Sequence, residues 1–301
     1  MTSIAALQAV EQGLFTLDQD ISPLIPEISK NGVLQGFTEE GKAIVEERKN
    51  PITLRQLITH ASGATYPTFH PWTLKHQTQR GIDPLGQNNA ATVTERHDAA
   101  MVFQPGEGWM YSPGLDWYGL LLQRKTKGQY DLESWMREFL WKPLGISQAE
   151  ITFWPDEAMK RKIPPLMVRN SEGKLCPNTA DTINTLSTEC FGGHGAYAEL
   201  SAYTKILRSL LADDGTLLRK TTVREMFRPQ LGDASRAALN GFMQRTVALL
   251  PGDLDPEIPV TYGLGGMLFE AGEVDRRLKG TMNWSGLFNC FWILDREAGI
   301  A

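Results

Sequence analysis

The chain is poor in cysteine and has no excess of positive charge. Its three cysteines, Cys176, Cys190 and Cys290, cannot form a closed set of disulfides, and none lies in a C-x-x-C pair typical of metal sites. Unpaired thiols are typical of a reducing compartment, so we expect a cytoplasmic protein. The formal net charge is -5. Because a nucleic-acid partner requires a basic surface that neutralises phosphates, this charge argues against one.

The sequence also lacks a long apolar run. No stretch approaches the roughly 20 apolar residues that a membrane-spanning helix requires, so we expect no membrane partner. The first residues carry no basic segment followed by an apolar core, and we therefore expect no signal peptide. Apolar residues make up 42% of the chain and charged residues 22%, which is ordinary for a globular protein of 301 residues. No feature of this composition favours one oligomeric state.

Motifs for metal and nucleotide binding are scarce. The five histidines include no H-E-x-x-H sequence and no pair spaced by four residues, so we expect no metal site. Residues 193–198 fit a loose G-x-G-x-x-A fingerprint, but residues 188–190 before it make no convincing strand. A dinucleotide site needs that strand, so we expect no cofactor.

A recognisable nucleophile is missing as well. No serine lies in a G-x-S-x-G elbow, and Ser62 is better explained by a turn that ends a helix. The S-x-x-K sequence occurs once, at Ser171–Lys174. Its chemistry requires a helix, which places the serine and a lysine of depressed pKa on one face. Asn170–Lys174 is instead a polar segment that contains a glycine, which predicts a hairpin tip.

Helical patterns dominate the middle of the chain and strand patterns its end. We expect helices at 1–14, from a capping box at 53–56 to about 63, at 115–128, at 132–142, around 207–215, and after a second capping box at 222–225. We expect strands at 262–269, 278–284 and 291–294, and long loops at 75–95 and 231–258. Helices followed by a small antiparallel sheet favour an α+β fold over alternating βαβ units.

Both ends of the chain lack features that the pattern requires. The helix at 1–14 has no N-cap residue of its own. The last residue, Ala301, follows directly after a strand-like run with no closing element. We therefore expect a fold that is incomplete at both termini.

Six segments, taken in order, carry a resemblance to one family. They are Ile52–Gly63, Phe103–Glu107 with Tyr111–Gly114, Trp141–Gly145, Gly192–Gly195, Tyr262–Gly265 and Trp284–Gly286. The chain resembles the serine β-lactamase and penicillin-binding-protein superfamily, in its branch of class C-like esterases and transesterases. This resemblance implies an antiparallel sheet flanked by helices beside a mostly helical region, with the site between them. In one domain over 1–301, the sheet side is expected at about 1–30 and 186–301, and the helical region at about 31–185.

The resemblance also implies an acyl-enzyme mechanism and a set of site residues. A serine attacks an ester, thioester or lactam carbonyl, and water or an acceptor alcohol then releases the acyl group. Tyr111 matches the tyrosine of the family's second motif, which moves a proton between the serine and a lysine. Trp284-Ser285-Gly286 matches the third motif on an edge strand facing the cleft, and the Leu287 backbone N–H is then an oxyanion donor. His194 and Gly195 lie in a loop that resembles one bordering the family's cleft, where they would contact substrate.

Each of these matches has a structural alternative. The phenol of Tyr111 could simply pack under a Pro-Gly turn. Trp284 could be a core side chain of a plain strand, and Ser285 gains no nucleophilic role from the match. His194 could be a loop residue without any catalytic duty.

The family's first motif, S-x-x-K, is the departure. In the family pattern the nucleophilic serine and its lysine fall just upstream of Met1, in the helix that continues into Met1–Gln8. We therefore expect a serine esterase or transesterase for small-molecule acyl donors and acceptors, inactive as these 301 residues because the nucleophile is missing. One alternative is a pseudoenzyme that keeps the cleft to bind a small ligand or a protein partner. Another is an unrelated hydrolase that uses Ser62.

Overall fold

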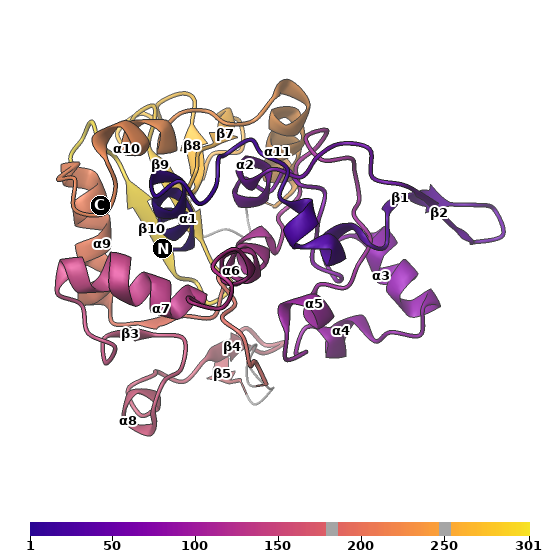
Figure 1. Cartoon of the computed structure of the whole chain (residues 1–301), viewed down its shortest axis with the longest axis horizontal. Helices are drawn as coiled ribbons and strands as arrows, with labels where there is room; N and C mark the ends of the chain where they lie inside the picture. Colours follow the sequence, from indigo (N-terminus) through magenta and orange to yellow (C-terminus); the bar gives the residue numbers. More distant parts are fainter. Residues whose placement is uncertain (179–185, 247–253) are drawn as a thin grey trace.

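The structure, a computed structural model, describes residues 1–178, 186–246 and 254–301. The main sheet has four antiparallel strands in the order β10-β9-β8-β7, and helices pack around it (Figure 1). The α+β fold expected from the sequence is confirmed. The four strands are β7 (Val260–Tyr262), β8 (Met267–Phe269), β9 (Met282–Ser285) and β10 (Phe291–Leu294).

Helix α1 (Thr2–Glu11) is the central element of the fold. Every residue from Thr2 to Ala9 is buried, so the helix is enclosed on all sides and not only along its apolar face. Two of its polar side chains donate to backbone carbonyls of other segments: Thr2 Oγ1 donates to Gly192 O at 2.6 Å, and Gln8 Nε2 donates to Phe139 O at 2.7 Å. Met1 is the N-cap and makes no side-chain capping bond. The helix ends before Gly13, which adopts a left-handed φ of 75°.

The other described helices range in length from four residues to fourteen. They are α2 (Leu54–Ile58), α3 (Pro71–Gln79), α4 (Pro84–Gln87), α5 (Val93–Arg96), α6 (Gly114–Lys125), α7 (Leu132–Met136), α8 (Glu157–Lys160), α9 (Leu200–Ala212), α10 (Lys220–Met226) and α11 (Asp233–Thr246). A π-helical turn at Arg137–Trp141 continues α7, and 3-10 turns lie at Ser22–Leu24, Pro26–Ser29 and Lys142–Leu144. Among the described residues, none of the helices has both the length and the hydrophobicity to cross a membrane.

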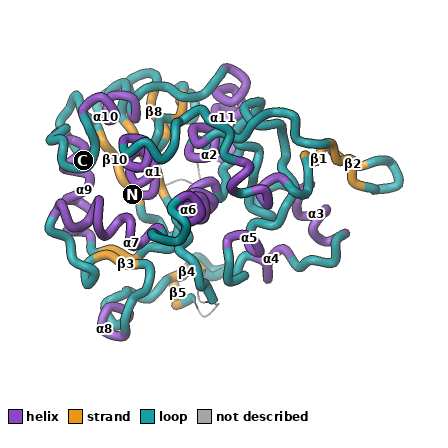
Figure 2. Tube along the Cα trace, viewed as in Figure 1, coloured by secondary structure: helices purple, strands orange, loops and turns teal. Residues whose placement is uncertain are grey.

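Three small antiparallel pairs complete the strands. They are β1 (Val33–Phe37) with β2 (Ala43–Glu46), β3 (Ile151–Thr152) with β6 (Tyr197–Ala198), and β4 (Met167–Arg169) with β5 (Leu175–Pro177). The β1–β2 hairpin extends from the body at the end that carries α3, α4 and α5, where loops join short helices (Figure 2). The β4–β5 pair confirms the hairpin predicted around Ser171–Lys174.

The first capping box is confirmed and the second is wrong. Thr53 Oγ1 accepts from Gln56 N, and Gln56 Oε1 accepts from Thr53 N, so both bonds of the box are present at α2. Thr222, however, lies inside α10, whose N-cap is Arg219. The Arg219 N–H is bonded to Glu11 Oε1 of α1 at 2.8 Å, a partner 208 residues away. A local pattern has no information about such a contact.

Two segments expected to be loops contain helices. Residues 75–95 include most of α3 and all of α4, because the Asp83 carboxylate caps the amides of Leu85 and Gly86 behind Pro84. Residues 231–258 include α11, and residues 247–253 of that range lie outside the described part. Both loop predictions were therefore wrong.

The strand predictions needed two corrections. The run 262–269 is the end of β7 and all of β8, joined by a glycine turn in which Gly263 N donates to Gly266 O at 2.8 Å. Trp284 was expected on an edge strand, but in the described sheet β9 lies between β8 and β10. Trp284 pairs with Trp292 of β10. Sequence alone did not show that β10 covers this edge.

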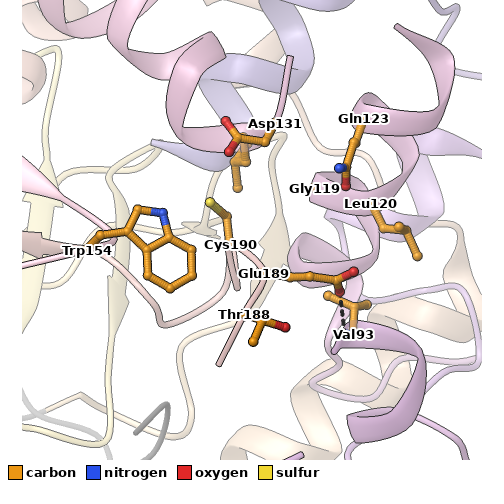
Figure 3. A pocket seen from close by; sticks show the side chains of 10 residues that line it. Val93, Gly119, Leu120, Gln123, Asp131, Trp154, Thr188, Glu189 and Cys190 are labelled. Carbon is orange, nitrogen blue, oxygen red and sulfur yellow. Dashed lines mark hydrogen bonds between the residues drawn. The ribbon is translucent and has the colours of Figure 1, made fainter. Parts of the chain in front are cut away.

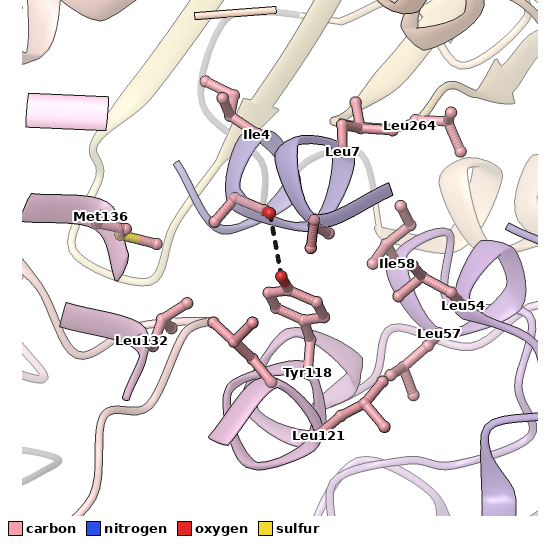
Figure 4. Close-up of a cluster of buried hydrophobic side chains, with 14 of the residues drawn as sticks. Ile4, Leu7, Leu54, Leu57, Ile58, Tyr118, Leu121, Leu132, Met136 and Leu264 are labelled. Carbon is pink, nitrogen blue, oxygen red and sulfur yellow. Dashed lines mark hydrogen bonds between the residues drawn. The ribbon is translucent and has the colours of Figure 1, made fainter. Parts of the chain in front are cut away.

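The core lies where α1 meets α6, α7 and the sheet. Ile4 and Leu7 of α1 are fully buried, and Figure 4 shows them on the side of the helix that faces Leu264. On the opposite side the Tyr118 hydroxyl of α6 donates to Ala5 O at 3.0 Å. Burial of each side chain of leucine size contributes about 1.5–3 kcal/mol, so the packing of Ile4 and Leu7 holds the beginning of α1 in place. A second apolar cluster lies between α11 and the sheet.

Candidate active site

Tyr111 lies in the loop before α6, within a group of aromatic rings. Its ring is stacked against Tyr66 at 5.6 Å, against Trp284 at 5.6 Å and against Phe69 at 5.9 Å between centroids. Tyr66 is buried, Tyr111 and Trp284 are half-buried, and Phe69 is exposed. The stack therefore runs from the interior to the surface and joins the second and third motifs (Trp284-Ser285-Gly286) of the sequence.

The phenol of Tyr111 is held in its neutral form. Burial raises its pKa above the ordinary value, and the carboxylate of Asp116 raises it further. Hydrogen bonds from Trp284 and Tyr66 act in the opposite direction but do not outweigh burial. Near neutral pH the phenol therefore keeps its proton and can donate it. It can act as a base only as the phenolate, which a nearby cation would stabilise.

The residues after Trp284 form the turn between β9 and β10. Ser285 ends β9 and is half-buried. Gly286 N donates to Cys290 O at 2.8 Å, which closes the hairpin. Leu287 lies in this turn with 80% of its surface exposed. The structure thus brings Trp284 against Tyr111, whereas the oxyanion role of the Leu287 N–H and the substrate contacts of Ser285 and Gly286 stay predictions.

The glycine loop at Gly192–Gly195 borders the same aromatic group. The His194 ring is stacked on Phe191 with centroids 5.6 Å apart, and it lies 6.5 Å from Tyr66. Gly195 is buried and lines a cavity of about 350 Å³ together with Phe191. A Cβ at Gly195 would lie 2.7 Å from Phe191 O, so the close turn requires glycine. Contact of His194 and Gly195 with substrate stays a prediction.

A buried Asp–His pair supports this loop, and sequence reasoning missed it. Asp116 Oδ2 accepts from His97 Nε2 at 2.8 Å, and Asp116 Oδ1 accepts from Gly193 N at 2.7 Å. His194 Nε2 lies 3.7 Å from the same carboxylate. Burial opposes the charge of Asp116, but the imidazoles of His194 and His97 and the Gly193 N–H stabilise it, so its pKa lies below the ordinary value. In the sequence, Asp116 looks like an ordinary acidic residue in the first turn of a helix.

The alternative nucleophiles within the described residues are not placed for catalysis. Ser62 Oγ is fully buried and has no hydrogen-bond partner in the described part of the chain, so no described base contacts it. Ser171 and Lys174 lie in the exposed turn between β4 and β5, where Asn170 Oδ1 accepts from Lys174 N at 2.9 Å. No helix brings this serine and lysine onto one face.

Cys190 lines a separate, small cavity, of about 60 Å³, between α6 and the segment that precedes the glycine loop (Figure 3). Glu189 beside it accepts from Val93 N at 2.7 Å and so ties this segment to α5. Burial raises the pKa of the Cys190 thiol to about 12. A thiol that is neutral at pH 7 is a poor nucleophile. Across the described ranges, no group of three or more His, Cys, Asp and Glu side chains could hold a metal ion.

Comparisons with known proteins agree on one family. The family model described as Beta-lactamase matches residues 1–301. The lovastatin esterase of Penicillium rubens is 34% identical over 305 residues, which cover 99% of this chain and 74% of that protein. A monacolin J acid methylbutanoyltransferase of Aspergillus terreus is 34% identical over 304 residues, 100% of this chain and 72% of that protein. Among solved structures, the LovD6 mutant of the Aspergillus terreus simvastatin synthase superposes with a TM-score of 0.87 at 34% identity, covering 99% of this chain and 72% of that one.

Proposed function

Since the chain belongs to the beta-lactamase family, we propose that it provides the cleft and the acid–base tyrosine of a serine acyl hydrolase or acyltransferase. The stack of Tyr111 against Trp284 carries this proposal, because it joins two of the family's motifs across the helical and sheet parts of the fold. The relatives are named as an esterase and as a methylbutanoyltransferase. We extend that class to this chain as transfer of an acyl group from an ester or thioester to water or to an alcohol.

Each site residue has a defined role in this proposal. Tyr111 moves the proton between the attacking hydroxyl and the leaving group. The Leu287 N–H donates to the oxyanion of the tetrahedral intermediate, beside the wall formed by Trp284-Ser285-Gly286. The loop with His194 and Gly195 borders the acyl group on the other side. Because the pKa of Tyr111 is raised, its phenol is neutral near pH 7. A lysine ammonium nearby would lower that pKa and so allow Tyr111 to act first as a base.

The serine and lysine of the family's S-x-x-K motif would fit directly before the beginning of α1. Thr2 Oγ1 is bonded to Gly192 O, and the next residue, Gly193, would place a Cβ 3.4 Å from the Tyr66 hydroxyl. Tyr66 is stacked on Tyr111. One further helical turn before Met1 would therefore bring side chains towards the phenol. Ser171–Lys174, the single S-x-x-K of residues 1–301, forms an exposed hairpin. We therefore propose that residues 1–301 on their own bind an acyl ligand but do not hydrolyse or transfer its acyl group.

The experiment compares the 301-residue chain with versions that carry a helical S-x-x-K extension directly before Met1. Successive residues of a helix are rotated by about 100°, so four registers offset by one residue sample all directions. We expect p-nitrophenyl butyrate hydrolysis at the buffer rate for the 301-residue chain and a clear rate in one register. Tyr111→Phe in that register should lower the rate about 10²- to 10⁴-fold, whereas the control Tyr130→Phe should not.

The same proteins separate the enzyme from a binding protein. A pseudoenzyme would bind a non-hydrolysable phenyl ketone, detected by isothermal titration calorimetry, without turnover in any register. The exposed face of Phe69 on the Tyr111 stack favours this second candidate, because it offers a flat apolar surface to a ligand. Absence of both binding and turnover in folded proteins would refute both functions.

A further inference from the structure

His60 has an unusual backbone conformation beside Tyr111. It follows the end of α2 with a φ of 63°, in the left-handed region that side chains with a Cβ rarely adopt. Such a conformation costs about 1–2 kcal/mol and persists only where the surrounding structure imposes it. The His60 side chain is 2% exposed, so its surroundings are entirely protein.

Hydrogen bonds join His60 to both chain neighbours of Tyr111. The Met110 N–H donates to the His60 carbonyl oxygen at 3.1 Å. The Ser112 N–H donates to His60 Nδ1 at 3.2 Å, and Ser112 Oγ lies 3.0 Å from the same nitrogen. One residue, 51 positions away in the sequence, thus holds the backbone before and after the tyrosine.

The protonation state of His60 follows from these bonds. Because Nδ1 accepts the Ser112 N–H, the ring proton lies on Nε2 and the imidazole is neutral. Burial lowers the pKa of His60 to about 3. A group that stays neutral across the physiological range does not exchange protons with substrate, so His60 has no acid–base role there.

The His60 ring also packs against the rings of the aromatic group around Tyr111. Its centroid lies 4.9 Å from that of Tyr111, 5.2 Å from Tyr262 of β7 and 6.1 Å from Trp284 of β9. The Trp109 ring packs on it from the loop before α6 at 5.7 Å. One imidazole therefore contacts the loop that carries Tyr111 and two strands of the sheet.

We propose that His60 is a positioning residue, which fixes the Tyr111 phenol against Trp284 by bonding the neighbours of Tyr111 and packing on its ring. It contacts no reacting atom and acts only through Tyr111. The inference rests on the proposed function for the importance of Tyr111, but the placement of the phenol is measured without any catalysis.

The test uses nitration of tyrosine by tetranitromethane, which requires an accessible phenolate. The 301-residue chain, His60→Asn and His60→Gly are treated at pH 8, and nitration of Tyr111 and Tyr118 is followed by peptide mass spectrometry. Asparagine and glycine both tolerate a left-handed φ, but only asparagine retains an acceptor near the position of Nδ1. Tyr118, buried in the core against Ala5, reports unfolding of the whole domain.

We expect Tyr111 of the unmodified chain to resist nitration. In His60→Gly the rate at Tyr111 should rise about tenfold, because the phenol loses packing and burial raises its pKa less, with Tyr118 unchanged. In His60→Asn it should rise less. An unchanged Tyr111 rate in His60→Gly, or a parallel rise at Tyr118, would overturn the proposal. If His60→Gly does not fold, His60→Asn, which also lacks the imidazole ring packed on Tyr111, is judged by the same criterion: a rise at Tyr111 alone supports positioning, and no rise refutes it.

Discussion

Replacement of Asp116 by alanine tests the buried pair that supports the glycine loop. The carboxylate is fully buried and accepts from His97 Nε2 at 2.8 Å and from Gly193 N at 2.7 Å. Alanine removes the acceptor of both donors, of which His97 is fully buried and Gly193 half-buried. His97 Nδ1 also has no partner within the described residues. A change of tautomer, which would move the ring proton from Nε2 to Nδ1, therefore gives the donor no new acceptor. Because His97 is neutral, the loss is that of two donors without an acceptor, and at about 1–3 kcal/mol each we expect the free energy of unfolding to fall by about 2–6 kcal/mol.

Asp116→Asn separates the effect of charge from that of shape. The asparagine oxygen can still accept from Gly193 N, but its amide group then faces His97 Nε2–H, donor against donor. His97 relieves this clash by moving its proton to Nδ1, where the N–H is buried without a described partner. One unsatisfied buried donor costs about 1–3 kcal/mol, so the asparagine variant should be less destabilised than the alanine variant.

Urea unfolding at pH 7, followed by circular dichroism, measures both variants. Asp18→Ala is the control, because Asp18 is 68% exposed and its pair with Arg55 should contribute less than about 1 kcal/mol. We expect the unfolding midpoints to fall in the order Asp18→Ala, Asp116→Asn, Asp116→Ala. If Asp116→Ala unfolds within about 1 kcal/mol of the control, the pair does not hold the loop and the argument is refuted.

Two further predictions concern neighbouring residues. Folded His60 stays neutral down to a pKa of about 3, whereas the unfolded imidazole takes up a proton near 6.5, so unfolding binds a proton between these pH values. Urea titrations from pH 6.5 to 4 should therefore show stability falling by about 1.4 kcal/mol per pH unit from this residue, and an unchanged slope in His60→Asn contradicts it. Gly114→Ala would place a Cβ 1.9 Å from Leu57 O. It should cost about 3 kcal/mol or prevent folding, and a melting temperature equal to that of the control Gly232→Ala, where a Cβ meets open space, contradicts it.

The family and the fold class were accessible from the sequence because their signals are local. The six ordered segments indicated a β-lactamase-related domain, and the family model and the α+β architecture confirm it. The capping box at Thr53 and the hairpin at Ser171–Lys174 were also predicted correctly. In each case the bonds that form the element lie within a few residues of one another, so the residue types already specify them.

The errors arose where a distant partner decides the local structure. The start of α10 depends on Glu11 of α1, and the edge of β9 is covered by β10. The short helices within 75–95 are a different kind of error. Their capping residue Asp83 and Pro84 were visible, but the segment has too few apolar residues to show helical periodicity.

The candidate site divides in the same way. From its residue types alone, the chain specifies its motifs, the turn before α6 and the acidic first turn that carries Asp116. Only the tertiary structure decides that Asp116 meets Gly193, 77 residues away, and that His60 meets Ser112, 52 residues away. The reason is physical: a polar side chain in water gains little from any one partner, whereas a buried one must be paired. Which side chains lose their water depends on packing of the whole chain.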